Sequence, residues 1–143
     1  MQTFVPLGDV RGCACVLDNR RLNKQITECK QIARVLRGES VGWRNHPATR
    51  MWGGCEQFLA YYAMCCYIEW ITRWVIGRRG GKHTHAAGDW FRQEYDFEEG
   101  IRPEWWGGVI HASHRAALLF KDNEWYQQWG WKEEPKLNYV WPV

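Results

Sequence analysis

Apolar residues recur at every third or fourth position between residues 18 and 37, which is the spacing of one face of an α-helix. Asp18 or Asn19 can cap the start of this helix, and Gly38 supplies a C-terminal stop. The spacing therefore predicts an amphipathic helix that ends near residue 37, with an apolar stripe made of Leu22, Ile26, Cys29, Ala33 and Leu36.

A second helical pattern begins at Pro47, because proline is favoured in the first turn of a helix. This helix is expected to extend over residues 48–76, with a disturbance at Gly53-Gly54. The run CEQFLAYYAMCCYIEWITRWVI is apolar on most faces, which is typical of a central buried helix. A third helix is predicted from near Val109 through HASHRAALLFKD, and a short one over residues 87–95.

The segments between these helices carry breakers, and strand signals are almost absent. Pro6, Gly8 and Gly12 predict an irregular or extended N-terminal arm over residues 1–16. We expect the fold to be all-α, with residues 1–143 forming a single compact domain of three main helices. The remaining irregular segments are residues 38–52, 77–85, 98–108 and an aromatic C-terminal tail, 123–143.

Hydropathy and charge narrow the class of protein. No run of apolar residues is long enough for a membrane span, and the N-terminus lacks the basic start and apolar core of a signal peptide. We therefore expect a cytoplasmic protein without a membrane partner. The net charge of +3 favours an anionic partner only weakly, but the cations are clustered. The clusters are Arg20, Arg21 and Lys24, and Arg78, Arg79 and Lys82.

Six cysteines leave a choice between structural and metal-binding roles. Several of them fall inside apolar helical patterns, so we interpret most as small buried hydrophobic residues rather than disulfide partners. A zinc site is the alternative, and its candidate ligands are Cys13, Cys15, His83, His85, His111 and His114. Because no pair of C-x2-C knuckles exists and the histidine spacings fit no metal motif well, we expect neither a metal nor a cofactor.

The first helix carries an unusual polar strip. Arg21, Lys24, Glu28 and Gln31 lie along one line of the helix, so that a single carboxylate stands among cations on the flank of the apolar stripe. One interpretation is a solvated helix face. The other is a site in which Glu28 takes part in chemistry and the cations bind an anion.

Two segments resemble one known family. The stretch LDNRRLNKQITECKQIARVLRGESVGWRNHP looks like the first helix and following loop of the pyrimidine-dimer DNA glycosylases, the phage endonuclease V type and its bacterial relatives. The stretch SHRAALLFKDNEWYQQWGW resembles their C-terminal signature, a helix, a short break and a cluster of Trp and Tyr. Motif order and spacing agree over most of the chain, whereas residues 53–108 match no motif of the family residue by residue.

The resemblance implies three helices with the N-terminal arm threaded against them, and a DNA glycosylase with abasic-site lyase activity. In that scheme the N-terminal α-amine attacks C1′ of the damaged nucleotide, the base leaves, and β-elimination of the resulting imine nicks the strand. An α-amine has an ordinary pKa of about 7.7–8.0, so part of it is nucleophilic at neutral pH. The family's glutamate falls on Glu28, and the amine belongs to Met1.

This chain departs from the family at three positions. It begins Met1-Gln2, where the best-known members have Met-Thr and lose the methionine. Gln2 is too large for efficient methionine removal, so Met1 would itself supply the amine. Thr27 and Gln31 stand where the family often has cations, which predicts weaker binding to duplex DNA.

Other residues are candidates for contacts with a nucleic acid or nucleotide, each with a structural alternative. The loop residues Arg44, Asn45 and His46 can bind phosphate or fix a turn. His114 and Arg115 lie near a helix start, where anions are favoured, although a structural role for His114 is the simpler interpretation. The chain has 11 Trp, and aromatic side chains beside cations can stack on bases or simply pack; the candidates for stacking are Trp125 and Trp129.

Three hypotheses follow from the sequence. The first is a DNA glycosylase that acts on a pyrimidine dimer or another modified pyrimidine, with DNA as its partner. The second is a non-catalytic module that binds a nucleotide or nucleic acid on the same fold. The third is a protein-interaction module that uses its tryptophan-rich surface. In the first two, binding is expected to involve Arg20, Arg21, Lys24, Thr27 and Gln31 together with the loop and tail residues named above.

Overall fold

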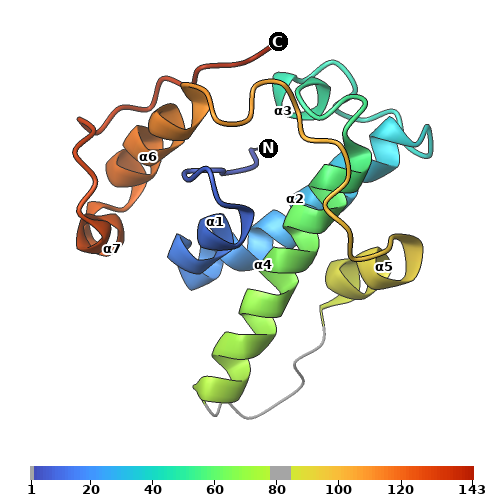
Figure 1. The fold of residues 1–143 in the computed structure, drawn as a ribbon, viewed down its shortest axis with the longest axis horizontal. Coiled ribbons are helices and arrows are strands. Elements are labelled where there is room, and N and C mark those ends of the chain that lie inside the picture. Colours follow the sequence, from blue (N-terminus) through green and yellow to red (C-terminus); the bar gives the residue numbers. More distant parts are fainter. Residues whose placement is uncertain (1, 78–84) are drawn as a thin grey trace.

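The computed structural model describes residues 2–77 and 85–143, and within these ranges every regular element is helical. This confirms the all-α prediction. Three long helices, α2, α4 and α6, dominate the structure (Figure 1). The elements are α1 (Val10–Val16), α2 (Asn19–Leu36), α3 (Pro47–Arg50), α4 (Glu56–Ile76), α5 (Ala86–Glu94), α6 (Ile110–Lys121), α7 (Asn123–Tyr126) and the 3₁₀ turn η1 (Gln127–Trp129).

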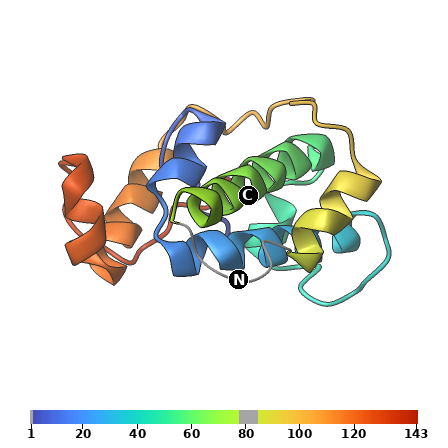
Figure 2. The same cartoon turned by 90° about the horizontal axis from the view of Figure 1, so that it is seen from below.

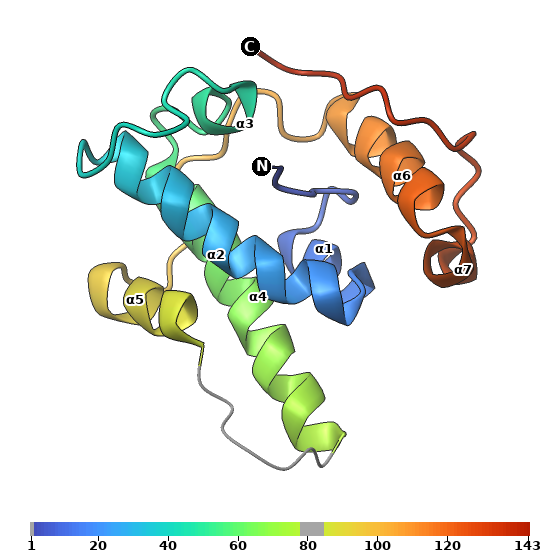
Figure 3. The same cartoon turned by 180° about the vertical axis from the view of Figure 1, so that it is seen from behind.

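Helix α2 forms as its sequence predicts. Asp18 caps it by accepting a hydrogen bond from the backbone N–H of Arg21, and Gly38 follows its end with a φ of 78°. The apolar stripe is buried against α4, and the two helices cross with the most extensive contact between any two elements (Figure 3). This places the polar flank of α2, with Glu28, on the side facing the N-terminal arm.

The helix expected over residues 48–76 is two helices. α3 ends at Arg50 and α4 begins at Glu56, because Gly54 adopts a φ of 76° that a continuous helix does not permit. The first half of α4 is buried, as predicted, whereas Val75 and Ile76 at its end are exposed. In the view from below, α4 lies between α2 and the irregular segment 98–108, with α5 at one end and α6 at the other (Figure 2).

The prediction of an irregular arm over residues 1–16 is wrong in its second half. Residues 10–16 form α1, because Asp9 caps the helix by accepting a hydrogen bond from the N–H of Gly12, the residue that had been interpreted as a breaker. The described residues before Asp9 do form an extended arm, which lies between α2 and α6 (Figures 1 and 3). The arm is buried from Gln2 to Pro6.

The C-terminal tail returns along α6 after α7 and η1. The backbone N–H of Lys136 donates to the carbonyl of Ala116, and that of Val140 donates to the Ser113 hydroxyl. These bonds bring Tyr139 beside the arm, with its ring 6.3 Å from that of Phe4. The tail therefore closes the space between α6 and the start of the chain.

The cysteines and tryptophans follow the sequence-based interpretation in most cases. All six cysteines are free thiols, four of them buried, and burial raises the pKa of Cys13 to about 12. Trp52 is fully buried and donates to the Thr3 hydroxyl, whereas Trp43 is exposed. Within residues 2–77 and 85–143, no cluster of side chains could hold a metal ion, and no helix has the length and hydropathy of a membrane span.

Candidate active site

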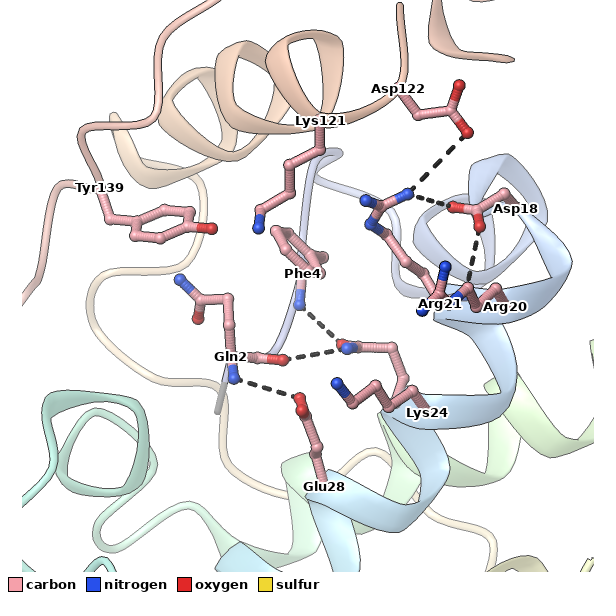
Figure 4. A pocket seen from close by; sticks show the side chains of 11 residues that line it. Gln2, Phe4, Asp18, Arg20, Arg21, Lys24, Glu28, Lys121, Asp122 and Tyr139 are labelled. Carbon is pink, nitrogen blue, oxygen red and sulfur yellow. Dashed lines mark hydrogen bonds and ion pairs between the residues drawn. The ribbon is translucent and has the colours of Figure 1, made fainter. Parts of the chain in front are cut away.

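A cavity of about 540 Å³ opens where the arm, α2, the end of α6 and the tail meet (Figure 4). Its volume is typical of sites that hold a molecule the size of a nucleotide. The residues come from parts of the chain that are far apart in the sequence. They are Gln2, Phe4, Asp18, Arg20, Arg21, Lys24, Gln25, Glu28, Lys121, Asp122 and Tyr139.

Helix α2 supplies the polar wall of this cavity, as its spacing predicts. Arg21, Lys24 and Glu28 are three and four residues apart, so their side chains leave the helix on one face. Arg20 lies beside them on the same wall. Glu28 is half-buried, which agrees with its predicted place on the flank of the apolar stripe.

Glu28 holds the main chain of the arm. Its Oε2 accepts a hydrogen bond of 3.1 Å from the backbone nitrogen of Gln2. One turn earlier, Gln25 donates to the Gln2 carbonyl at 3.0 Å and accepts from the Phe4 nitrogen at 2.7 Å. Tyr62 on α4 donates to this arrangement, within 2.9 Å of Gln25 Oε1 and 2.5 Å of the Phe4 carbonyl. The start of the described chain is thus fixed against the only carboxylate in the middle of α2.

Two histidines of α6 fix the arm from the other side. His114 Nδ1 accepts from the Val5 nitrogen at 2.9 Å, and His111 Nδ1 lies 2.6 Å from the Val5 carbonyl. Because His111 Nε2 also accepts from the Gly107 nitrogen, its Nδ1 is the donor. Burial lowers the pKa of His114 to about 3, with a smaller contribution from His111, so the His114 ring is neutral at physiological pH.

The charges around the cavity are not all neutralised. Arg21 pairs with Asp18 at 3.1 Å and approaches Asp122 at 4.0 Å. Although burial opposes ionisation of Asp18, hydrogen bonds from Tyr126 and Arg21 hold its pKa below the ordinary value. In contrast, none of the ion pairs of the described residues involves the other three cations of the cavity, Arg20, Lys24 and Lys121.

The charges of the cavity suit a ligand that carries phosphate groups and has a sugar ring on which positive charge develops during a reaction. Unpaired ammonium and guanidinium groups attract phosphate. A carboxylate fixed close to them can stabilise a positive charge that develops on a sugar ring or transfer a proton to or from it. The cavity contains both kinds of group, cations and a fixed carboxylate, in a space large enough for a nucleotide.

Seven residues of this cavity are not among the site residues that the sequence predicts, and one of these seven, Asp18, is expected only as the cap of α2. Another had a recognisable signal, because Gln25 is a polar residue inside the apolar stripe, three residues after Leu22 and four before Cys29. It is 2% exposed and makes the arm contacts described above. The other five meet only through the tertiary fold: Gln2, Phe4, Lys121, Asp122 and Tyr139.

Thr27 and Gln31 do not line this cavity. They face a second hollow of about 450 Å³ on the neighbouring side of α2, so the predicted strip from Arg21 to Gln31 is divided between two sites. Trp43 borders the second hollow with a φ of 65°, a left-handed conformation that is uncommon for a bulky residue. The remaining lining residues are Lys30, Arg34, Val35, Ser40 and Gly42.

The predicted loop residues lie outside both hollows. Arg44 and Asn45 are exposed, and no hydrogen bond or ion pair of the described residues involves either side chain. His46 is the N-cap of α3 and accepts from the Ala48 nitrogen at 3.0 Å, which is the turn-fixing role given as its alternative. Its ring also lies 5.9 Å from that of Trp141.

Three of the remaining four binding candidates, all except Trp129, are buried or bonded within the protein. His114 is fully buried, so it has no exposed surface with which to contact DNA. Arg115 forms a forked pair with Glu133 and donates to the Pro6 carbonyl at 2.8 Å. Trp125 donates to the Val16 carbonyl at 2.8 Å and is half-buried, whereas Trp129 is 39% exposed.

Several predicted residues lie outside the described part of the chain. Met1, the expected source of the amine, is one of them. The basic cluster Arg78, Arg79 and Lys82 and the zinc candidate His83 also fall there.

Comparison with known proteins gives one match. A family model described as pyrimidine dimer DNA glycosylase matches residues 1–89, which is more than half of the chain and contains the arm, α2 and Glu28. No curated protein and no solved structure matches the chain. The match confirms the resemblance found in the first helix and its following loop.

Proposed function

Because this chain belongs to the pyrimidine dimer DNA glycosylase family, we propose that it cleaves the bond between a dimerised or otherwise modified pyrimidine base and its deoxyribose in DNA, with Glu28 as the catalytic carboxylate. The observation that carries this proposal is the 3.1 Å hydrogen bond from the Gln2 nitrogen to Glu28 on the wall of the cation-rich cavity. This hydrogen bond links the start of the described chain to the carboxylate on the wall of the cation-rich cavity.

The nucleophile in this proposal is the α-amine of Met1. Met1 is bonded directly to Gln2, whose backbone nitrogen donates to Glu28, and this covalent connection supports a reaction in which the Met1 amine and Glu28 act together. The amine attacks C1′ of the nucleotide, and the bond from C1′ to the base breaks with its electron pair leaving on the base. Glu28 stabilises the positive charge that grows on the sugar as this bond breaks.

The lyase step uses the same groups. Loss of a proton from the amine nitrogen and opening of the sugar ring give an imine between Met1 and C1′. Glu28 then accepts a proton from C2′, the electrons of that C–H bond form a double bond to C3′, and the 3′ phosphate leaves. Water releases the protein from the sugar by hydrolysis of the imine.

The unpaired cations bind the DNA backbone in this proposal. Lys24 and Arg20 on α2 and Lys121 on α6 face the cavity from two sides, so they can contact the phosphates that flank one nucleotide. Their positions support a substrate nucleotide that is turned out of the duplex into the cavity.

The experiment is a single-turnover assay of glycosidic-bond cleavage in a duplex with one thymine dimer, read as strand breaks at the dimer after alkali, because the cleaved thymine stays joined to its neighbour through the cyclobutane ring. We expect Glu28→Gln to slow this cleavage by about 10²–10³-fold, because the amide keeps the hydrogen bond from Gln2 but cannot stabilise positive charge. Glu134→Gln is the matched control, since Glu134 is exposed and lines neither hollow.

The same assay separates the alternative functions. Equal rates for the wild-type protein and Glu28→Gln would contradict a catalytic role for the carboxylate. Binding of the duplex by both proteins, with no glycosidic-bond cleavage at a panel of pyrimidine lesions, would instead favour the non-catalytic nucleic-acid-binding module.

A further inference from the structure

Gln2 is a buried residue on the cavity wall, and among the described residues its side-chain amide has no hydrogen-bond partner. The residue is 8% exposed, and neither Nε2 nor Oε1 makes a hydrogen bond within residues 2–77 and 85–143. Its backbone nitrogen and carbonyl, in contrast, are both bonded, to Glu28 and Gln25. A buried unpaired amide is costly in free energy and is rare in native proteins, which points to a ligand as its missing partner.

The surroundings of this amide are suited to a planar ring. The Gln2 side chain rises from the arm towards Tyr139, away from the backbone nitrogen that contacts Glu28 (Figure 4). Phe4, two residues later on the arm, and Tyr139, from the tail, both line the cavity. A nucleobase in the cavity would therefore have aromatic surface to stack on and an amide at its edge.

The hydrogen-bonding groups of the cavity favour one kind of base edge. Asp18 and Asp122 already accept hydrogen bonds from Arg21 and from the backbone of Trp125, whereas Arg20, Lys24 and Lys121 have donors to spare. A ligand with more acceptors than donors suits this balance. The imide edge of thymine or uracil, in which one N–H lies between two carbonyl groups, has that composition.

We propose that Gln2 determines base specificity by binding the imide edge of a thymine-type pyrimidine. Its Oε1 accepts from N3–H of the base and its Nε2 donates to the neighbouring carbonyl, a pair of parallel hydrogen bonds that one carboxamide can make. This inference rests on the proposed function. It adds that the residue directly after the nucleophile reads the base, so that recognition and the position of the amine are set by the same short segment.

The test measures binding rather than glycosidic-bond cleavage, so that it does not depend on the chemistry. Two duplexes are compared, each with one thymine dimer opposite two abasic spacers, and in one of them N3 of both thymines is methylated. The spacers ensure that methylation removes no Watson–Crick pair. For the wild-type protein we expect methylation to weaken binding roughly tenfold or more, since a bidentate contact is lost.

The variant Gln2→Met shows whether Gln2 is responsible. Methionine has nearly the length of glutamine and is also too large to promote removal of Met1, so the start of the chain is kept. We expect Gln2→Met to bind the two duplexes with equal affinity. A far-ultraviolet circular dichroism spectrum like that of the wild-type protein shows that the helices are intact.

Three results would overturn the inference. The first is a wild-type protein that does not distinguish the two duplexes, whether or not the variant folds. The second is an equal effect of methylation in Gln2→Met, and the third is tighter binding of the corresponding cytosine dimer. Discrimination by the wild-type protein without glycosidic-bond cleavage would support this inference while contradicting the proposed function, so the two can fail separately.

Discussion

The two hollows beside α2 differ in what surrounds their cations. The first contains Glu28, the start of the described chain and three cations without an ion pair among the described residues. The second contains no acid, and its cations have partners, since Lys30 lies 5.5 Å from the centre of the Trp90 ring and Arg34 pairs with Glu39 at 3.6 Å. One helix thus presents two basic surfaces of different character.

The two hollows show that the groups needed to bind a nucleic acid differ from those needed for a reaction. Positive charge alone can hold a nucleic-acid backbone, and both hollows have it. A reaction at a sugar also needs a nucleophile and a group that stabilises developing positive charge. Only in the first hollow does the fold bring a carboxylate to the arm, because α6 and the tail hold the arm against α2.

The largest expected effect comes from moving the start of the chain. A protein encoded as Met-Gly-Met1-Gln2 loses its first methionine before the small glycine, which leaves one extra residue and displaces the amine by up to about 3.7 Å. Since a misplacement of about 1 Å can cost a factor of about 10², we expect the rate of glycosidic-bond cleavage in a thymine-dimer duplex to fall by at least that factor.

The control for this extension is an added glycine after Val143. We expect that variant to keep its activity, and both variants to bind DNA as the wild-type protein does, because neither change touches the cations. If the extended protein cleaved the dimer at the normal rate, the position of the first residue would not matter for the reaction. The contact between Glu28 and the arm would then no longer distinguish the first hollow from the second.

The second effect concerns the histidines that hold the arm. His114 has a pKa of about 3 in the folded protein, below its ordinary value of about 6.5, because it is buried. The unfolded chain therefore binds a proton that the folded protein does not, and stability falls as the pH is lowered from about 6.5 towards 3. The slope from this residue approaches about 1.4 kcal/mol per pH unit below pH 6, which gives a loss of about 2 kcal/mol between pH 6.5 and 4.5.

His114→Asn keeps an acceptor for the Val5 nitrogen but does not titrate. Urea unfolding at pH 6.5 and 4.5 should therefore show a smaller loss of stability with acid for the variant than for the wild-type protein. The comparison is between slopes, so a lower stability of the variant at pH 6.5 does not affect it. Equal slopes would show that His114 is not the buried neutral group described above.

The third effect is at the cap of α2, which begins the wall of the first hollow. Asp18 accepts from the Arg21 backbone, pairs with the Arg21 side chain and accepts from the Tyr126 hydroxyl. We expect Asp18→Ala to lower the free energy of unfolding by about 2 kcal/mol, through the lost cap and the unpaired groups left behind.

Asp18→Asn should cost only about half as much, because asparagine caps helices as well as aspartate does. Urea denaturation of the two variants tests the order. A loss for Asp18→Asn equal to that for Asp18→Ala would mean that the ion pair, rather than the cap, dominates.

The smallest expected effect is on DNA binding, to which the cations of the first hollow should contribute more than those of the second. Lys24→Ala should weaken binding to a thymine-dimer duplex several-fold and reduce the slope of log K against log salt concentration by about 1, as expected for one lost phosphate contact. Lys30→Ala, on the second hollow, should change the slope by clearly less. Binding titrations between 50 and 200 mM salt measure the slope for both variants. A larger change in slope for Lys30→Ala than for Lys24→Ala would indicate that the second hollow, rather than the first, contacts the DNA backbone.

The sequence predicted the parts of the fold that depend on local signals. Helix α2 has a capping Asp18, a regular apolar stripe and a terminal Gly38, and its observed bounds agree with the prediction. Helix α1 is not predicted, because Pro6, Gly8 and Gly12 indicate an irregular segment, whereas the structure has Asp9 as an N-cap and Gly12 inside the helix. Gly54 was noted as a disturbance, but only its positive φ shows that α3 and α4 are separate.

The candidate site could be predicted only where one helix carries it. Arg21, Lys24 and Glu28 meet through helical spacing, which a sequence displays directly. Gln2, Lys121 and Tyr139 reach the same cavity from the arm, α6 and the tail, and no local pattern encodes such long-range contacts. The burial of His114 agrees with the structural role that the sequence favoured over a nucleic-acid contact, although the arm and tail residues that pack around it could not be identified from the sequence.

The most direct test of the central claim is to identify the atom that becomes bonded to the sugar. The wild-type protein is incubated with a thymine-dimer duplex and sodium borohydride, which reduces an imine to a stable amine, and the adduct is located by peptide mass spectrometry. We predict one adduct, on the α-amine of the peptide that begins with Met1. An adduct on Lys24 or Lys121, or cleavage of the glycosidic bond without any adduct, would contradict the claim that the amine of Met1 is the nucleophile that acts together with Glu28.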